Sequence, residues 1–255
     1  MSKGQHQGEV ALVTGANKGL GKQIARRLAA EGMTVYVGAR DARRGEETEQ
    51  ELKAAGYDAR FVQLDVTNQA QVEAAAKRIE AESGRLDVLV NNAGIVVEWG
   101  VPVADITADR MRKAFDVNVF GTVAVTQACI PLLRRSDAPR VVNMSSPLGS
   151  LTFLSDPEHP ISTRGLLPYS ASKAALNAIT VVYAHSLREE GIRVNAANPG
   201  LVATDLNADS PFSRGTRSPE EGADTPVWLA LTGPDGPTGT FSGGMDGTVD
   251  EIVPW

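Results

Sequence analysis

The chain has 255 residues, 42% of them hydrophobic, so it is long enough to bury one large core or two small ones and is neither disordered nor fibrous. Its 25 Lys and Arg against 31 Asp and Glu give a net charge of −6, which argues against a nucleic-acid or anionic-membrane surface spread over the whole protein. The single cysteine, Cys129, excludes an internal disulfide, and His6, His159 and His185 lack the spacing of metal ligands, so we expect no metal site.

Short runs rich in β-branched residues alternate with longer segments of helical periodicity, a pattern typical of βα units on a parallel sheet. Expected strands cover 10–14, 34–39, 58–64, 88–91, 140–144, 193–197 and 239–242, and expected helices cover 20–31, 43–55, 69–83, 108–135, 169–190 and 219–231. No linker divides the chain. The pattern therefore predicts an α/β protein: one doubly wound Rossmann domain at 9–255, with a seven-stranded parallel sheet and helices on both faces.

The start of the chain is polar and leads only to a four-residue apolar run at 10–13. We therefore expect a flexible N-terminal tail at 1–8, no secretory signal and no membrane-spanning helix, and we assign the protein to the cytoplasm. Cys129 is expected to be a buried small apolar residue.

Two stretches interrupt the alternation, and both follow the carboxyl ends of expected strands. Residues 147–168 contain four prolines, and residues 199–219 are rich in Ser, Asp, Asn and Pro. An open α/β sheet places its ligand crevice at that edge, so an insertion at about 150–167 and a substrate loop at about 202–218 are candidate walls of a site. Ordinary surface loops are the alternative interpretation.

The first strand leads directly into a helix through a glycine-rich turn, Thr14-Gly15-Ala16-Asn17-Lys18-Gly19-Leu20-Gly21. These glycines let the backbone turn tightly and approach a pyrophosphate, whose charge is favoured at the start of a helix. A P-loop is the alternative, but Ala16 replaces its first glycine and Gln23 replaces its Ser or Thr. We therefore expect Gly15 and residues 17–21 to bind a dinucleotide.

The end of the second strand indicates which dinucleotide is bound. An NAD site places an acid there to accept from the ribose 2′-hydroxyl, whereas the 2′-phosphate of NADP needs a cation. Here Ala39 is followed by Arg40, which we take as the main NADP(H) determinant, with Lys18 second and Arg43 or Arg44 as helpers. A solvated helix face explains the last two arginines equally well.

Two interpretations of the third strand end stay open. Asp65, followed by Val66, is placed where a carboxylate reads the amino group of an adenine. It is equally well placed to belong to the N-terminal cap region of the helix that begins near Asn68.

Tyr169 and Lys173 are four residues apart, so on a helix they share one face about one turn apart. A phenol has a reference pKa near 10, and a neighbouring cation favours its ionised form and lowers that pKa. The pair is therefore a candidate for proton transfer. By itself a Tyr-x3-Lys pattern is also common on helix surfaces. The catalytic interpretation therefore depends on the other motifs that accompany it in the chain.

These motifs occur in the order and near the spacings typical of one family: Thr14-Gly-x3-Gly-x-Gly21, Asn91-Asn92-Ala93-Gly94, Asn118, Val142-Asn-Met-Ser145-Ser146, Tyr169-x3-Lys173 and Asn198-Pro199-Gly200. From about residue 9 to the end, the chain resembles the short-chain dehydrogenase/reductase family. Ala39-Arg40-Asp41, Asn17-Lys18 and the segment from Ser218 to Leu231 look most like its NADPH-dependent carbonyl reductase branch.

The resemblance implies a catalytic role for four residues. Tyr169 would protonate the carbonyl oxygen as hydride arrives from the nicotinamide, and Lys173 would lower the tyrosine pKa and hold the nicotinamide ribose. Ser146 would bind the substrate oxygen, with Ser145 as the alternative. Asn118 would anchor a water that links Lys173 to solvent.

The resemblance also implies the remaining cofactor contacts. Asn91, Ala93 and Gly94 would pack beside the adenosine ribose and steady the sheet. Around the nicotinamide, the lining residues would be Pro199, Gly200, Val202 and Thr204, with Thr204 or the Val202 backbone meeting the carboxamide. Taken alone, Asn91-Asn92 fits a turn after a strand, and Asn118 fits a polar interruption of a long helix.

The chain departs from the family pattern between Ser146 and Tyr169. The 22 intervening residues are more than in typical members and fewer than in animal carbonyl reductases. Because that insertion precedes the helix that often forms the family's dimer interface, both a monomer and a homo-oligomer stay open. The insertion also supplies candidate substrate-pocket residues, which with those of the later loop are Leu151, Phe153, Leu154, Leu206 and Phe212.

The sequence thus predicts a cytoplasmic NADPH-dependent carbonyl reductase (ketoreductase) that acts on a small-molecule ketone or aldehyde, without metal, nucleic acid or membrane. An NAD-dependent alcohol dehydrogenase of the same family is the first alternative. A non-catalytic NADP(H)-binding regulator is the second, although such a protein is expected to lose Tyr169 or Lys173.

Overall fold

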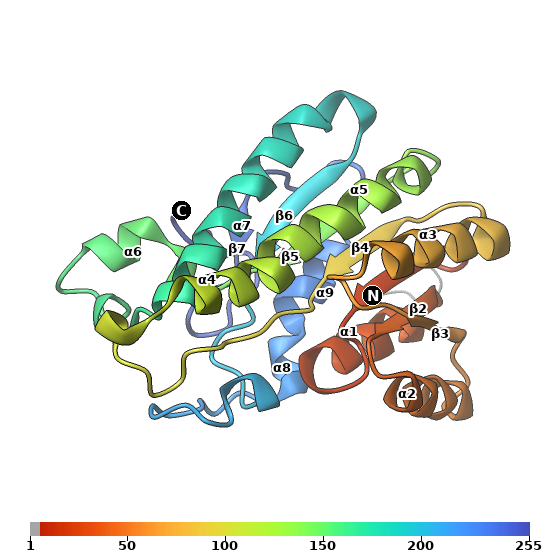
Figure 1. Ribbon diagram of the computed structural model, residues 1–255. Helices are drawn as coiled ribbons and strands as arrows, with labels where there is room; N and C mark the ends of the chain where they lie inside the picture. The colour runs from red at the N-terminus through yellow and green to blue at the C-terminus, as the bar shows by residue number, and fades with distance from the viewer. Residues whose placement is uncertain (1–5) are drawn as a thin grey trace.

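A seven-stranded sheet runs through the middle of the molecule (Figure 1). The computed structural model describes residues 6–255, so residues 1–5 of the expected N-terminal tail lie outside it. In spatial order the strands are β3 (Ala59–Gln63), β2 (Thr34–Ala39), β1 (Val10–Thr14), β4 (Val88–Asn91), β5 (Arg140–Met144), β6 (Arg193–Ala197) and β7 (Phe241–Ser242). Each neighbouring pair is parallel, which confirms the expected sheet.

Helices cover both faces of this sheet, as Figure 1 shows. One face carries α1 (Gly19–Ala30), α2 (Ala42–Ala54), α8 (Pro219–Gly222) and α9 (Asp224–Ala230). The other carries α3 (Gln69–Ser83), α5 (Thr122–Leu133) and α7 (Leu167–Ser186), with α4 (Ala108–Phe115) against the start of α7. The fold is thus the doubly wound α/β class that the alternation of strands and helices predicts.

Two adjacent residues of β1 show why both faces need helices. Leu12 and Val13 point to opposite sides of the sheet, because side chains alternate along a strand. Leu12 packs in a cluster with Leu89 of β4 and Ile79 of α3, whereas Val13 packs in another with Ile24 of α1. Each of these side chains is at most 1% exposed, and burying one contributes about 1.5–3 kcal/mol.

The expected helix at 108–135 is a composite. After α4 the backbone widens into a π-helical segment, Asp116–Gly121, before it continues as α5. The whole span Ala108–Leu133 is long and apolar enough to cross a membrane, yet half of its most apolar stretch is buried, so it is a core helix of this fold. Cys129 of α5 is buried as expected, and burial raises the pKa of its thiol to about 12.

Three other expectations need adjustment. The expected helix at 219–231 is divided into α8 and α9 at Ala223. The insertion contains a five-residue helix, α6 (Leu151–Ser155), which is too short to leave a periodic signal. Residues 6–8, expected as part of the flexible tail, instead form a turn in which Gly8 N donates to Gly32 O at 3.3 Å.

Candidate active site

The motifs singled out from the sequence meet at the carboxyl edge of the sheet. The glycine-rich turn follows β1, the Asn91–Gly94 segment ends β4, Ser145 and Ser146 follow β5, and Asn198 follows β6. The strand order reverses between β1 and β4, and at such a point an open α/β sheet leaves a crevice for a ligand.

The glycine-rich turn can be this tight only because its glycines carry no side chains. Gly15 and Gly19 have φ angles of +63° and +51°, in the left-handed region that favours glycine. A Cβ on Gly21 would lie 2.4 Å from both Gly15 O and Asn92 Nδ2. Lys18, at the N-cap of α1, makes no side-chain cap hydrogen bond to the helix. A closely approached helix start of this kind fits the pyrophosphate of a dinucleotide.

Hydrogen bonds between β1 and β4 hold this turn in place. Thr14 Oγ1 accepts from the backbone nitrogens of Asn92 at 3.0 Å and Ala93 at 2.9 Å. Asn92 Nδ2 donates in return to Thr14 O at 2.9 Å and to Gly15 O at 3.3 Å. The position of the glycine turn is therefore set by Asn92, which we had not counted among the cofactor residues.

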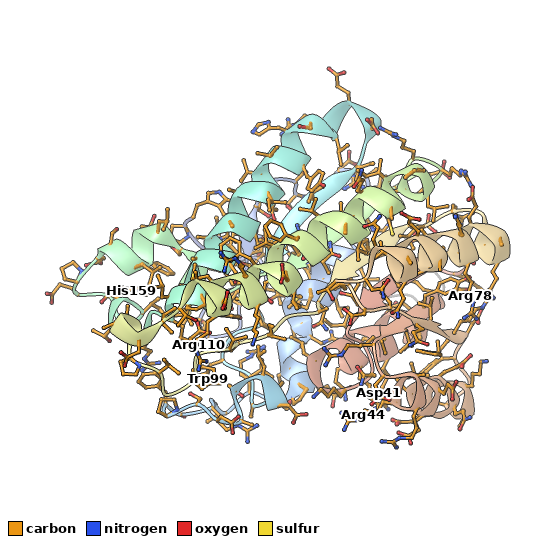
Figure 2. All side chains as sticks on the ribbon, in the orientation of Figure 1. Asp41, Arg44, Arg78, Trp99, Arg110 and His159 are labelled. Atoms are coloured by element: carbon orange, nitrogen blue, oxygen red, sulfur yellow. The ribbon has the colours of Figure 1, made fainter. Side chains whose placement is uncertain are left out.

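Beside the turn lies an open pocket of about 360 Å³, lined by Asn17, Lys18, Lys22, Arg44, Glu47, Thr48, Glu51 and Asp205. Its charges are mixed. Lys18 Nζ lies 2.8 Å from Asp205 Oδ2, and Lys22 is paired with Glu51. Arg44, at the start of α2 (Figure 2), has its Nε 3.6 Å from Asp41 Oδ2. The hydrogen bond from Lys18 holds the pKa of the Asp205 carboxyl below its usual value.

The three expected arginines are placed differently around this pocket. Arg44 lines it, whereas Arg40, at the end of β2, is exposed and lies outside its lining. Arg43 pairs with Glu47 one turn further along α2, at 2.6 Å, with most of its side chain exposed. Arg43 thus fits the solvated helix face, and Arg44 is the arginine that faces the pocket.

The structure favours the second interpretation of Asp65. Its Oδ1 accepts from Thr67 N at 3.0 Å and from Thr67 Oγ1 at 2.7 Å, in the turn before α3. The N-cap itself is Asn68, whose side chain accepts from Gln71 N. Val66 is buried, and a Cβ on Gly121 would lie 2.6 Å from its side chain.

Tyr169 and Lys173 lie one turn apart in the first half of α7, and both are buried. Lys173 Nζ lies 5.4 Å from the centre of the Tyr169 ring and donates to Met144 O, at the end of β5, at 2.7 Å. A Cβ on Gly149 would lie only 2.7 Å from the Lys173 backbone and side chain, so the loop after β5 packs tightly on this turn of α7. The sheet and the loop together therefore fix the pair.

Burial controls the ionisation of this pair. It raises the pKa of Tyr169 to about 12, against a hydrogen bond with Ser146 that lowers it, and the charge of Glu98 raises it further. Burial also lowers the pKa of Lys173 to about 8. The sequence predicted that Lys173 lowers the tyrosine pKa. In the structure the pKa of Tyr169 is instead raised, mainly by burial, and the Lys173 ammonium donates to Met144 O.

The two adjacent serines after β5 have different partners. Ser145 is buried, and its Oγ donates to Asn177 Oδ1 at 2.6 Å. Ser146 is only partly buried, its Oγ accepts from Leu148 N at 3.2 Å, and its hydroxyl lowers the pKa of the Tyr169 phenol. Of the two serines, Ser146 is therefore the one that influences the phenol.

Asn118 lies in the π-helical segment and is 1% exposed. Its Oδ1 accepts from Ile95 N at 2.9 Å, and its Nδ2 donates to Ile95 O and to Ser172 Oγ, both at 3.0 Å. A Cβ on Gly94 would lie 3.4 Å from Asn118 Oδ1 and 3.7 Å from Lys173 Nζ. Gly94 thus lies close to both Asn118 and Lys173, and a side chain added there would contact both.

Asn91 occupies a buried position in the sheet. Its Nδ2 donates to Thr126 Oγ1 of α5 at 3.0 Å and to Asn143 Oδ1 of β5 at 2.9 Å. Asn143 Nδ2 continues the chain of bonds to Thr180 Oγ1 of α7 at 2.9 Å. Of the two roles expected for Asn91, the structure therefore supports that of steadying the sheet.

The segment after β6 is shaped by Asn198, whose Oδ1 accepts from Gly200 N at 2.9 Å. Gly200, after Pro199, has a φ of +75°, which turns the chain toward the substrate loop. Val202 is buried against Gly222 of α8. Thr204 faces the glycine turn, since a Cβ on Gly19 would lie 3.7 Å from its Cγ2.

The expected substrate-pocket residues form two groups. Leu151, Leu206 and Phe212 are exposed on the insertion and on the substrate loop. Phe153 instead stacks on His159 within the insertion, at 4.0 Å between ring centres, and Leu154 packs near Gly165. Figure 1 shows the insertion, with α6, at the end of the molecule beside the C-terminus, and Thr152 N donates to Trp255 O at 3.1 Å.

Three functional candidates were missed from the sequence: Asn92, Asp205 and Glu98. Asn92 stands inside a motif that we had recognised, but Asp205 and Glu98 lie in irregular segments and carry no periodic signal. Glu98 is 1% exposed, and its carboxyl group accepts from the backbone nitrogen of Tyr169 at 2.7 Å. Within residues 6–255, no cluster of His, Cys, Asp and Glu side chains is arranged to hold a metal ion.

Comparison with known proteins gives consistent matches. A family model described as "short chain dehydrogenase" matches residues 9–213. Short-chain dehydrogenase/reductase 1 of Saponaria officinalis is 35% identical over 98% of this chain and 97% of its own length. Carbonyl reductase [NADPH] 1 of Rattus norvegicus is 35% identical over 91% and 95%. The structure of salutaridine reductase from Papaver somniferum superposes with a TM-score of 0.78 at 32% identity, covering 91% of this chain and 99% of that one.

Proposed function

The chain belongs to the short-chain dehydrogenase/reductase family of oxidoreductases, and from this premise we propose that it is an NADPH-dependent carbonyl reductase. In this proposal a ketone or an aldehyde is reduced to an alcohol by hydride transfer. The observation that carries the proposal is the buried pair Tyr169 and Lys173, with the partly buried Ser146 beside it, at the carboxyl edge of the sheet next to the glycine turn. A proton donor and a dinucleotide site side by side are what such a reaction requires.

The residues around the glycine turn fit a dinucleotide. The positive φ angles of Gly15 and Gly19 shape the turn, and the absent Cβ of Gly21 lets Gly15 O and Asn92 pack directly against the start of α1. The helix dipole and its amide groups favour an anion there. When bound, NADPH supplies the hydride; this chain supplies the position of the substrate and its proton.

Tyr169 is the proton donor in the proposed reaction. Its phenol, held by Ser146, gives its proton to the carbonyl oxygen, and Ser146 hydrogen-bonds the same oxygen as negative charge develops on it. Lys173, held by Met144 O, binds the ribose hydroxyls of the cofactor. Asn118, facing Lys173 across Gly94, holds the water through which the proton is replaced.

Burial keeps the Tyr169 phenol protonated at neutral pH, which is the form that donates a proton in the proposed reduction. An NAD-dependent alcohol dehydrogenase is the weaker alternative, because the end of β2 carries no acid to accept from a ribose 2′-hydroxyl. A non-catalytic NADP(H)-binding regulator is weaker still, because all four expected catalytic residues are present and three lie together.

Preference for NADPH over NADH is part of the proposal. The end of β2 carries no acid to accept from a ribose 2′-hydroxyl, since Ala39 is followed by Arg40. Lys18 and Arg44 line the adjoining pocket, where they would meet the 2′-phosphate, although Asp205 competes for Lys18. The name of the rat relative, carbonyl reductase [NADPH] 1, adds support.

The experiment that tests this function compares the purified protein with its Tyr169→Phe variant. We expect the wild type to consume NADPH with an activated ketone and to yield the alcohol. Tyr169→Phe should lower kcat by about 10²- to 10⁴-fold, because the proton donor is lost. NADPH binding, followed by nucleotide fluorescence, should persist. A variant that keeps its activity would overturn the role of Tyr169, and a wild type inactive over a broad carbonyl panel would overturn the reductase assignment.

A further inference from the structure

Glu98 is a buried carboxylate that the proposed reaction has not yet used. It lies in the irregular segment between β4 and α4 and is 1% exposed. One carboxyl oxygen accepts from Tyr169 N at 2.7 Å, and the other accepts from Val97 N at 2.9 Å. A buried charge that ends on the backbone of the proposed proton donor calls for a physical explanation, because burying a carboxylate is costly without such partners.

The start of α7 lacks a local cap, and Glu98 supplies one from a distance. The N-cap residue, Leu166, has no side chain that can accept from the helix. Pro168 has no N–H, and the N–H of Tyr169 lies in the first turn, where no intrahelical partner is available. Glu98 accepts from this N–H. A carboxylate there also interacts favourably with the helix dipole.

The segment that carries Glu98 is anchored on both sides. The Arg110 guanidinium, on α4, donates to Val97 O. Trp99 Nε1 donates to Leu206 O, in the substrate loop, at 2.9 Å. Figure 2 shows Trp99 and Arg110 in this part of the molecule, below α4. Residues 97–99 therefore join α4, the first turn of α7 and the substrate loop.

We propose that Glu98 is a positioning residue that holds the first turn of α7, and with it Tyr169, at the reacting carbonyl. The inference rests on the proposed function, since it assigns to Glu98 a role in the proton transfer by Tyr169. Glu98 acts through the backbone of Tyr169 and through its charge, and it does not touch the substrate. The hydrogen bond fixes the turn of α7 that carries the phenol, and the negative charge disfavours the phenolate.

The charged groups that face Tyr169 come from three elements. Lys173, on α7, has its ammonium 5.4 Å from the ring centre. Glu98 reaches the helix from the segment after β4, and Arg110 of α4 bonds the backbone next to Glu98. Ser146, from the loop after β5, is the neutral partner of the phenol. Removing the Glu98 charge removes one of the causes that raise the pKa of Tyr169, so that pKa should fall.

The test uses two variants of Glu98 and one matched control. Glu98→Gln keeps an oxygen for Tyr169 N and removes the charge, whereas Glu98→Ala removes both. Asp105→Asn removes an exposed carboxylate from the same irregular segment. For each protein, kcat and KM are measured against pH for NADPH-dependent reduction, with circular dichroism as a check on folding.

We expect Glu98→Ala to lower kcat by about 10- to 100-fold, because a donor displaced by about 1 Å loses about that much, with an unchanged KM for NADPH. Glu98→Gln should keep most of the activity at low pH. Its reductive activity should fall at lower pH than that of the wild type, because its phenol ionises more easily. Asp105→Asn should match the wild type throughout.

A second readout does not depend on turnover. In protein labelled with ¹³C at the tyrosine Cζ, the Tyr169 resonance is the one missing from Tyr169→Phe. It should begin to shift at lower pH in Glu98→Gln than in wild type. Equal shifts, or an active wild type whose Glu98 variants keep its kcat and pH profile, would overturn the inference. A wild type without reductase activity would overturn the proposed function instead, and the resonance shift would still report on Glu98.

Discussion

The two sides of the site are built in opposite ways. On the cofactor side, strand ends and helix starts meet without room for added atoms: Gly21 has two polar atoms 2.4 Å from where a Cβ would lie, and Thr14 and Asn92 are joined by hydrogen bonds. On the substrate side, the walls are short helices and loops, and Leu206 and Phe212 are exposed.

Because of this difference, the residues proposed for the shared reaction and the residues proposed for substrate choice lie in different parts of the fold. In the proposed reaction, the steps common to every substrate depend on residues that the sheet holds in place, such as Lys173 on Met144 O. Substrate choice depends on side chains carried by irregular segments, which can change without disturbing the sheet. Glu98 and Trp99 connect the two sides, because one bonds the catalytic helix and the other the substrate loop.

The largest effect should come from crowding the cofactor side. Gly21→Ala places a Cβ against Gly15 O and Asn92 Nδ2, and we expect it to lower the free energy of unfolding by about 3 kcal/mol and to weaken NADPH binding. Gly56→Ala is the control: Gly56 has a φ of +85° and open space around it, so only backbone strain of about 1 kcal/mol is added. For both variants, denaturant unfolding measures the free energy of unfolding and nucleotide titration measures NADPH binding. If Gly21→Ala binds NADPH as tightly as the wild type does, the close packing of Gly21 against Gly15 and Asn92 is not required for cofactor binding.

Next in size is the stability change from removing the buried ammonium of Lys173. Its folded pKa of about 8 lies below the unfolded value, so the burial penalty is fully present below pH 8 and declines as pH rises toward about 10.5. The penalty is about 3 kcal/mol, and Lys173→Met loses the bond to Met144 O, worth about 1 kcal/mol.

We therefore expect Lys173→Met to abolish activity yet raise the free energy of unfolding at pH 7 by about 2 kcal/mol. Urea unfolding at several pH values measures this gain, which should vanish toward pH 10. A variant that is less stable than the wild type at pH 7 would contradict the burial penalty.

A tenfold effect is expected at the pocket beside the glycine turn. Arg44→Asp should raise the Kd for NADPH about tenfold, which corresponds to about 1.4 kcal/mol, and should leave NADH binding nearly unchanged. Arg40→Asp is the informative comparison, because Arg40 ends β2 outside the pocket lining. Titration of each variant with both nucleotides measures the effects. A larger loss in Arg40→Asp would return the main role to the residue chosen from the sequence.

The smallest effect should come from the substrate loop. Phe212→Ala, on an exposed side chain, should change the KM for bulky ketones by a few-fold, about 1 kcal/mol, with little change in stability. Val182→Ala, on an exposed position of α7, serves as the control and should leave kinetics unchanged. Steady-state kinetics over a panel of ketones of different size measures the KM of both variants. A large fall in kcat for every ketone would mean that the loop takes part in the shared reaction.

Most of the fold was readable from the sequence because each strand and helix repeats a local pattern. Six of the seven strands were expected within one residue of their observed bounds, and the parallel order follows from the alternation of strands and helices. The exceptions are elements that periodicity does not describe: the π-helical segment around Asn118, the five-residue α6 and the break between α8 and α9. Each depends on contacts with distant parts of the chain.

The sequence by itself determined the architecture and pointed to the side chains that we propose to react, because residue type and spacing carry that information along the chain. Tertiary structure alone decided two things: that Arg44 rather than Arg40 lines the pocket, and that Glu98 caps the helix of Tyr169. Tertiary structure also set the ionisation of the buried pair, because burial raises the pKa of Tyr169 and lowers the pKa of Lys173. Burial and long-range hydrogen bonds arise only when residues far apart in the chain are brought together, so no local pattern records them.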